Sequence, residues 1–362
     1  MGILTIKGQN RTITEGSMNE KLDVMIGQMI MVGFRGMEVN CDSTIIKHIR
    51  KYHIGGVWIV DNENPVDKSK GNIQSAKQLK KLTADLYAAA DILPLISIDA
   101  EGGRVIRLKE TYGFPKTYSA QYVGEKDDLE FTRSHSEKIA ELLSYNGINL
   151  NLAPVVDLFI NPNNPALGGK ERCYSDDPEK VLMHARQVIK VHHENNILCC
   201  LKHFPGHGCS TEDTHIGFVD VTKCWRKTEL YPYEKLIKED LADCILTAHI
   251  YNKNFDADYP ATLSKNILTG LLRERLGYDG VVISDDMMMG AIRNNYGYEE
   301  SIELAINAGV DIVLHSNATS YSEYNAEEMF WIIRKAVIEG RIPEKRIEES
   351  YNRILRLKTK IM

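Results

Sequence analysis

The chain has 362 residues, which is long enough for two ordinary domains or for one large α/β barrel. Its 44 basic and 50 acidic residues leave a net charge of −6, which argues against a nucleic-acid partner and against a basic membrane-binding patch. No apolar run approaches the roughly 20 residues that a bilayer-spanning helix needs.

Residues 1–17 are polar and lack the apolar core of a secretory signal peptide. Because Gly16, Ser17 and Met18 resemble a cloning junction, we expect a leader or a cloning remnant over residues 1–17 and one domain over residues 18–362. The seven cysteines are odd in number and include no Cys-x-x-Cys pair, which argues against a disulfide framework and a zinc–thiolate site. We therefore expect a reduced, cytoplasmic protein.

Short apolar runs rich in Val and Ile recur along the chain, separated by longer amphipathic segments. Most are almost continuously apolar, as expected for parallel strands that are covered on both faces. The eight runs are 29–33, 56–60, 93–99, 148–154, 197–202, 244–249, 280–285 and 310–316.

The segments between these runs have helical spacing of their apolar residues. Ser175 is expected to cap the helix that begins near Pro178. The predicted helices are 75–90, 178–195, 227–243, 263–276, 298–308, 326–340 and 343–358. Eight strand–helix alternations predict an α/β fold, a single (β/α)8 barrel of the TIM type, with a doubly wound open sheet as the alternative.

Polar residues gather at one end of nearly every predicted strand. In a barrel of this type the active site lies at the carboxyl ends of the strands, so these residues are the candidates for chemistry. They are Asp99, Arg107, Asp157, Arg172, Lys202, His203, His249, Asp285, Asp286 and His315. The chain has no P-loop and no Gly-x-Gly-x-x-Gly motif, so no nucleotide cofactor is indicated.

Residues 202–215 form the densest group of titratable side chains in the sequence. Pro205, Gly206 and Gly208 interrupt any regular structure, which predicts a loop directly after the fifth strand. His207 lies between the two glycines and is expected to stabilise this turn. Loops on a rigid scaffold commonly carry catalytic groups.

Six motifs resemble glycoside hydrolase family 3, and most closely its single-domain bacterial β-N-acetylhexosaminidases. The resemblance covers residue 18 to the C-terminus. The motifs are Asp99-Ala-Glu-Gly-Gly-Arg-Val-Ile-Arg107, Asn151-Leu-Ala-Pro-Val-Val-Asp157, Lys202-His-Phe-Pro-Gly-His-Gly208, Asp213-Thr-His215, Pro260-Ala-Thr-Leu-Ser264 and Ile283-Ser-Asp-Asp-Met287.

The resemblance implies a retaining exo-β-N-acetylglucosaminidase that removes terminal N-acetylglucosamine from peptidoglycan-derived or chitin fragments, without metal or cofactor. It implies Asp285 as the nucleophile, with Asp286 as the local rival, and His215 paired with Asp213 as the acid/base. A histidine suits that role because its pKa is ordinarily near 6.5, within reach of neutral pH. The residues implied to hold the sugar are Asp99, Arg107, Arg172, Lys202 and His203.

Other readings of the sequence stay open at this point. A β-glucosidase or a glycoside phosphorylase of the same family would use the same motifs. A metal-dependent barrel hydrolase would use His203, His207, His215, His249 and Asp285 as ligands. A sugar-binding barrel without catalysis is the third alternative. In the leading reading the partner is a small carbohydrate substrate, with no nucleic acid and no membrane.

Overall fold

The computed structural model describes residues 15–61, 71–214, 216–318 and 320–362. Its main sheet has eight strands in the order β10-β1-β2-β3-β6-β7-β8-β9, and every neighbouring pair is parallel. A further bridge between Ile283 and Ile312 joins the two ends of this order, so the sheet is a nearly closed barrel. The predicted (β/α)8 fold is confirmed.

All eight predicted strands are present within the predicted apolar runs or within two residues of them. The strands of the barrel are β1 (Ile30–Gly33), β2 (Gly56–Ile59), β3 (Leu95–Ile98), β6 (Leu150–Asn151), β7 (Leu198–Phe204), β8 (Cys244–Thr247), β9 (Val281–Ile283) and β10 (Val313–His315). Two short strands, β4 (Ala100–Gly102) and β5 (Val105–Ile106), form a separate hairpin after β3. Each barrel strand is fully buried, which is why its sequence is apolar on both faces.

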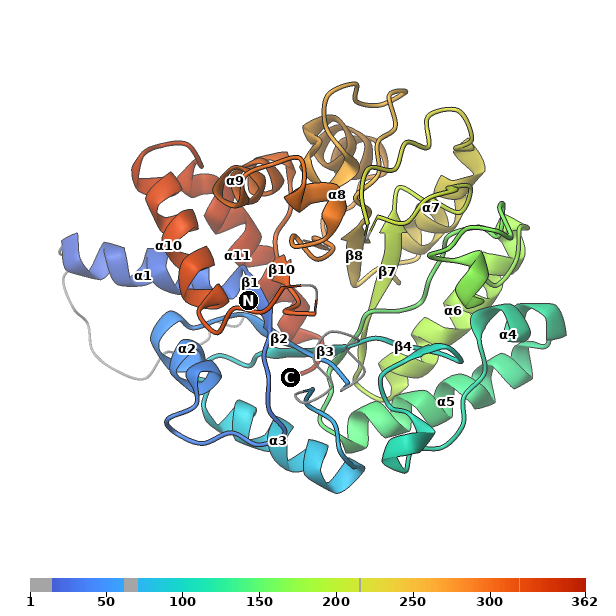
Figure 1. Ribbon diagram of the computed structural model, residues 1–362, viewed down its shortest axis with the longest axis horizontal. Helices are drawn as coiled ribbons and strands as arrows, with labels where there is room; N and C mark the ends of the chain where they lie inside the picture. Colours follow the sequence, from blue (N-terminus) through green and yellow to red (C-terminus); the bar gives the residue numbers. More distant parts are fainter. Residues whose placement is uncertain (1–14, 62–70, 215, 319) are drawn as a thin grey trace.

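Helices surround the strands. Helices α9, α10 and α11 lie on the side of β1 and β10, and α4, α5 and α6 lie on the opposite side near β7 (Figure 1). The α-helices are α1 (Glu15–Gln28), α2 (Thr44–Tyr52), α3 (Ala76–Ala88), α4 (Ala120–Lys126), α5 (Leu129–Tyr145), α6 (Pro178–Glu194), α7 (Tyr231–Lys238), α8 (Gly290–Arg293), α9 (Tyr298–Ala308), α10 (Asn325–Ile338) and α11 (Glu344–Thr359). The shorter or wider helices are η1 (Glu110–Tyr112), η2 (Gly168–Lys170), η3 (Lys227–Leu230), η4 (Ala261–Leu263) and η5 (Asn266–Arg275).

Three local details of the helices differ from the expectations. The cap of α6 is Asp177, whose side chain accepts from the Glu179 N–H, because Pro178 occupies the first helical position. The predicted helix 227–243 is split into the 3₁₀ turn η3 and the α-helix α7. The predicted helix 263–276 is a wide helix of the π type.

The prediction that residues 1–17 are a leader stays a prediction, since residues 1–14 lie outside the described part of the chain.

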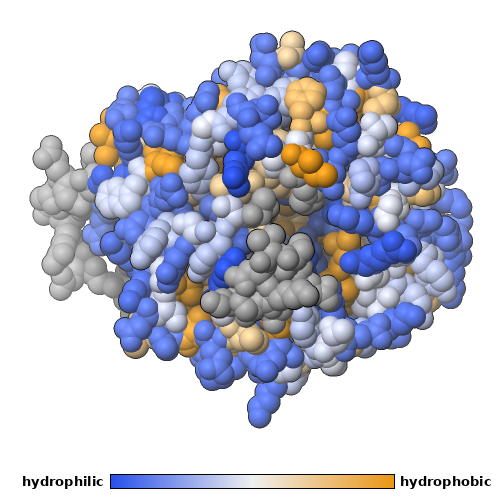
Figure 2. Space-filling view, viewed as in Figure 1, coloured by the Kyte–Doolittle hydropathy of each residue, from blue (hydrophilic) through white to orange (hydrophobic). Residues whose placement is uncertain are grey.

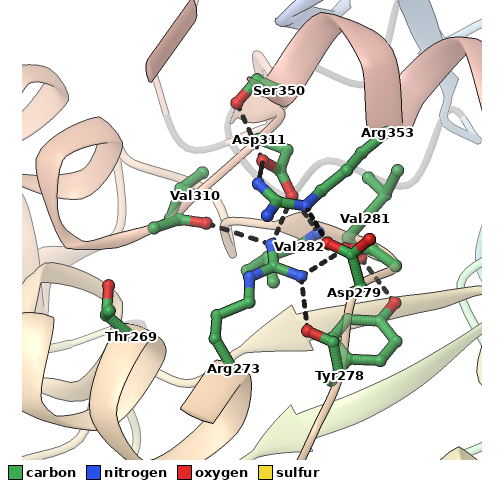
Figure 3. Close-up of polar contacts among 12 residues, drawn as sticks. Thr269, Arg273, Tyr278, Asp279, Val281, Val282, Val310, Asp311, Ser350 and Arg353 are labelled. Carbon is green, nitrogen blue, oxygen red and sulfur yellow. Dashed lines mark hydrogen bonds and ion pairs between the residues drawn. The ribbon is translucent and has the colours of Figure 1, made fainter. Parts of the chain in front are cut away.

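The barrel is closed between β9 and β10 by a buried carboxylate as well as by backbone. Asp311 donates its N–H to the Val282 carbonyl, and its side chain accepts from the Val282 N–H at 2.9 Å. The same carboxylate receives Arg273 at 2.6 Å, Arg346 at 3.0 Å and Arg353 at 3.4 Å. Figure 3 shows Arg273 and Arg353 beside Asp311. Asp311 therefore links two strands and two helices at the amino-terminal end of the barrel.

Lys358 is buried on α11 and gives a pH-dependent contribution to stability. Its ammonium group donates to the Gln28 side chain at 2.6 Å and to the Gly55 carbonyl at 2.9 Å, both of which are neutral. Burial lowers the pKa of Lys358 to about 7. Above this value the folded state releases the proton while the unfolded state keeps it, so stability rises with pH up to the ordinary lysine pKa.

We expect Lys358→Met to reduce this rise. Between about pH 7.5 and pH 9.5 the unfolding free energy of the wild type should increase by up to about 1.4 kcal/mol per pH unit more than that of the variant. Urea denaturation across this range measures the difference. Parallel stability curves for the two proteins would contradict the expectation.

The face of the molecule in Figure 2 is largely hydrophilic, and its hydrophobic residues lie in small separate patches. In the described residues we find no helix that is both long enough and apolar enough to cross a bilayer.

The expectation of a fully reduced chain is wrong in the structure. Cys209 and Cys224 form a disulfide, with their Cα atoms 5.8 Å apart. The expectation relied on the odd number of cysteines and on the absence of a closely spaced pair. It failed because a loop brings together these two cysteines, which are 15 residues apart. The loop between them carries Asp213.

Candidate active site

A cavity of about 300 Å³ opens at the carboxyl ends of the barrel strands. All five predicted sugar-binding residues line it, together with Asp285 and its neighbour Asp286. Its lining also contains Trp58 at β2 and apolar residues at three other strands. The lining residues used below are Trp58, Asp99, Arg107, Arg172, Lys202, His203, Asp285, Asp286 and Ser316.

One wall of the cavity is a network of alternating charges. The Lys202 ammonium lies 2.9 Å from the Asp99 carboxylate and 2.6 Å from that of Glu101. Arg172 binds Glu101 through two nitrogen atoms, at 2.7 and 2.8 Å, and Arg107 donates to Asp99 at 3.1 Å. The forked guanidinium–carboxylate contact fixes both planes, so this wall is preorganised.

Burial and charge act in opposite directions on this wall. Burial would raise the pKa of Asp99, but the charges of Lys202 and Arg107 outweigh it and hold the pKa of Asp99 well below its usual range. Burial would lower the pKa of Lys202, but Asp99 and Glu101 raise it. These groups are therefore ionised at neutral pH and present fixed charges and hydrogen-bond partners to a ligand rich in hydroxyl groups.

His203 connects this wall to a second buried carboxylate. Its Nδ1 lies 2.7 Å from Asp157, and its Nε2 lies 3.1 Å from the Arg172 guanidinium. Asp157 also accepts the backbone N–H of His203 at 3.0 Å and that of His207 at 2.9 Å. Burial would raise the pKa of Asp157, but its histidine neighbours and these hydrogen bonds lower it to about 2.

His207 lies in the turn, as predicted from its flanking glycines. Burial lowers the pKa of its ring to about 4, so the ring is neutral at pH 7. Its carbonyl accepts from the Asn164 side chain at 3.0 Å, which ties the turn to the long loop after β6.

The two adjacent carboxylates after β9 have different environments. The side chain of Asp286 is buried and accepts the N–H groups of Met288 and Ser316, at 3.1 and 3.2 Å, and the Ser316 hydroxyl. These contacts hold the loop after β10. Asp285 is only half-buried, lines the cavity, and accepts the Asp286 N–H at 2.8 Å. Asp285 is thus the member of the pair that is more accessible to a ligand.

The loop that carries Asp213 reaches the segment that follows Asp285. The Thr214 carbonyl accepts from the Ala291 N–H of α8 at 3.2 Å, and the Ile216 carbonyl accepts from the Asn294 side chain at 3.4 Å. Asp213 itself is not one of the described residues that line the cavity. His215, the predicted acid/base, lies outside the described residues.

Two of the histidines considered as metal ligands, His203 and His249, have both ring nitrogens in other contacts. His249 is buried and bonds Thr262 through Nδ1 and the Asp286 carbonyl through Nε2. Asp157, His203 and His207 do offer ligand atoms within 4.8 Å of one another. However, the Asp157 oxygens already accept three hydrogen bonds, and the Arg172 cation lies beside His203, so this set is poorly suited to a cation.

Sequence reasoning missed three residues of the site. Glu101 was part of a recognised motif, but its role as the shared partner of Lys202 and Arg172 was not predicted. Trp58 lies on β2, where it reads as an ordinary apolar strand residue; the Arg107 guanidinium lies 5.4 Å from its ring centre. Asp61, two residues after β2, accepts from Arg107 at 3.4 Å, and its position just past a strand end was the available signal.

Comparisons with known proteins agree with this geometry. Residues 21–357 match the family model described as the glycosyl hydrolase family 3 N-terminal domain. A β-hexosaminidase from Xanthomonas euvesicatoria is 35% identical over 259 residues, which are 68% of this chain and 74% of the relative. β-Hexosaminidase A from Pseudoalteromonas piscicida is 30% identical over 379 residues, covering 93% of this chain and 61% of the relative.

Solved structures give the same result. A family 3 β-N-acetylglucosaminidase from Paenibacillus superposes with a TM-score of 0.85 at 33% identity, over 94% of this chain and 62% of that protein. A β-N-acetylhexosaminidase from Beutenbergia cavernae superposes with a TM-score of 0.82 at 26% identity, over 93% of this chain and 98% of that protein. The chain spans about three fifths of the Pseudoalteromonas and Paenibacillus proteins. From its barrel, its motifs and these matches, the chain belongs to glycosyl hydrolase family 3.

Proposed function

We propose that this protein is a retaining exo-β-N-acetylglucosaminidase that releases terminal N-acetylglucosamine from peptidoglycan-derived or chitin fragments. The observation that carries the proposal is the accessible Asp285 carboxylate in a cavity whose other wall is the Asp99–Lys202–Glu101–Arg172 network. The names of the relatives, β-hexosaminidase and β-N-acetylglucosaminidase, support the same substrate class.

The size of the cavity supports removal of one terminal sugar. At about 300 Å³ it lies at the lower end of the range for ligand pockets, which favours a single sugar ring over an internal chain segment. In the proposed mode, Asp99, Arg107, Arg172, Lys202 and His203 hold the hydroxyl and N-acetyl groups. Such directed contacts fix the anomeric carbon against the nucleophile.

The proposed reaction has two steps. Asp285 attacks the anomeric carbon and forms an ester with it, while His215 gives a proton to the departing glycosidic oxygen. His215 then accepts a proton from water, whose oxygen displaces Asp285 and restores the carboxylate. Asp213 orients the histidine and stabilises its protonated form, as a carboxylate does in a Ser-His-Asp triad.

Hydrolysis of p-nitrophenyl β-glycosides tests the proposal. We expect kcat/KM for the N-acetylglucosaminide to exceed that for the glucoside by at least about 10²-fold. The glucoside lacks the N-acetyl group, so the protein groups that bind it would be left without a hydrogen-bond partner. Release of the β-anomer, measured by proton NMR before mutarotation, checks retention. Faster cleavage of the glucoside would make the protein a β-glucosidase, and a sugar phosphate product in phosphate buffer would make it a phosphorylase.

The proposal includes a cytoplasmic location and a small soluble carbohydrate as the partner. The Cys209–Cys224 disulfide is a feature that oxidising compartments favour. Cell fractionation with detection of the native protein therefore tests the location directly, and recovery outside the cytoplasm would contradict this part.

A further inference from the structure

Glu229 lies against the turn that joins β7 to the loop carrying Asp213. It belongs to η3, is completely buried, and accepts the Gly208 N–H at 2.9 Å. Its side chain also packs against Gly206, where a Cβ atom would lie 2.7 Å from the Glu229 Cβ. Gly206 has a φ of +102°, so the turn needs a glycine there for both space and conformation.

Two buried carboxyl groups together hold this turn. Asp157 accepts the N–H of His203 before the turn and that of His207 within it, and Glu229 accepts the N–H of Gly208 at its end. The His203 ring lines the cavity, and the chain after Gly208 leads into the loop that carries Asp213. The turn therefore joins the end of the strand that presents His203 to the cavity with the start of the loop.

We propose that Glu229 is a positioning residue for the glycosidase reaction: it fixes the turn that directly follows His203 at the end of β7 and from which the acid/base loop departs. The inference rests on the proposed function. Glu229 acts through Gly208 and the turn and is not among the described residues that line the cavity.

The ionisation of Glu229 gives this role a measurable signature. Burial, together with the negative charge of Asp157, raises the pKa of Glu229 to about 8, while the hydrogen bond from the Gly208 N–H and then Arg226 act in the opposite direction. Cys173 and Tyr233 are the other titratable groups that interact with it, and burial raises the pKa of each well above its ordinary value. At neutral pH Glu229 is therefore uncharged and accepts the turn's N–H through Oε2. Its Oε1 is buried and has no hydrogen-bond partner among the residues that the structure describes.

Loss of the Glu229 proton would place a second negative charge near the ionised Asp157 in a buried site. Unpaired buried charge is costly, so the turn is expected to move in order to solvate it. Glutamine keeps the acceptor for Gly208 and cannot ionise. Leucine has a similar volume but no acceptor.

The test is kcat/KM for the p-nitrophenyl N-acetylglucosaminide as a function of pH, for the wild type, Glu229→Gln and Glu229→Leu. Glu274→Gln is the matched control, since Glu274 is exposed on η5. Near pH 6.5 we expect kcat/KM of Glu229→Gln to lie within about threefold of the wild-type value. By pH 9.5 the ratio of the variant's kcat/KM to that of the wild type should rise about tenfold. Glu229→Leu is expected to lose about tenfold or more at every pH, because the Gly208 N–H is left unsatisfied.

The outcomes separate the two proposals. If the wild type is active and Glu229→Gln follows its pH profile as Glu274→Gln does, the positioning role is wrong. A merely structural role would lower the unfolding temperature of the Glu229 variants without altering the pH profile of activity. If the wild type cleaves no glycoside at any pH, the proposed function fails, and the positioning role fails with it.

Discussion

Replacement of Asp285 by alanine is expected to lower kcat for the p-nitrophenyl N-acetylglucosaminide by at least about 10³-fold. Losses of this size are typical when a catalytic nucleophile is removed from a group of residues that react together. The reason is geometric. Asp285 lines the cavity, whereas the Asp286 carboxylate is committed to Met288 and Ser316. Without Asp285 the carboxylates left in the cavity, Asp99 and Asp286, are engaged by other groups, and the sugar-binding wall is intact, so KM should change much less than kcat. Steady-state kinetics and a thermal unfolding curve for the folded variant measure this.

Azide rescue separates a nucleophile from a residue that only supports the site. In Asp285→Ala, azide can enter the space of the lost carboxylate and attack the anomeric carbon, so turnover should increase and give an α-glycosyl azide. Asp286→Ala removes the ties to Ser316 and Met288, so we expect a loss of activity and stability that azide does not restore. Full activity of Asp285→Ala, or rescue of Asp286→Ala instead, would overturn the assignment.

The sequence was most informative where a local pattern has one physical cause. A strand that is buried on both faces must be apolar throughout, so all eight barrel strands could be located from their runs. Residues just past the carboxyl ends of parallel strands must share one end of the barrel. That rule correctly brought Asp99, Lys202, His203 and Asp285 into one cavity.

Contacts between distant parts of the chain left no such pattern. Glu229 is 21 residues from Gly208 and reads as an ordinary charged residue at a helix start, because only the folded turn brings the two together. The same applies to the disulfide of Cys209 and Cys224. The three arginines around Asp311 come from two amphipathic helices, in which each reads as an ordinary residue of the polar face.

Asp311→Asn is expected to lower the unfolding free energy by about 3–5 kcal/mol, the cost of breaking a buried ion pair from one side. The Asp311 side chain is completely buried and binds Arg273, Arg346 and Arg353. Asparagine removes the charge that these three guanidinium groups share. It also leaves a single acceptor oxygen for the guanidinium groups and the Val282 N–H at the closure of the barrel, and its NH2 group faces these donors. Urea denaturation measures the loss.

Asp279→Asn is the matched control, because Asp279 binds the same Arg353 guanidinium at 2.9 Å but its side chain is 68% exposed. An exposed pair is worth at most about 1 kcal/mol, so this variant should be nearly as stable as the wild type. Asp311 precedes β10, at the end of the barrel opposite the cavity, so folded Asp311→Asn should keep its kcat at low temperature. A large loss of stability in Asp311→Asn alone would show that this carboxylate makes a main stabilising contact of the barrel. Equal losses in the two variants would contradict the expectation, because burial of Asp311 would then add nothing to the free energy of unfolding.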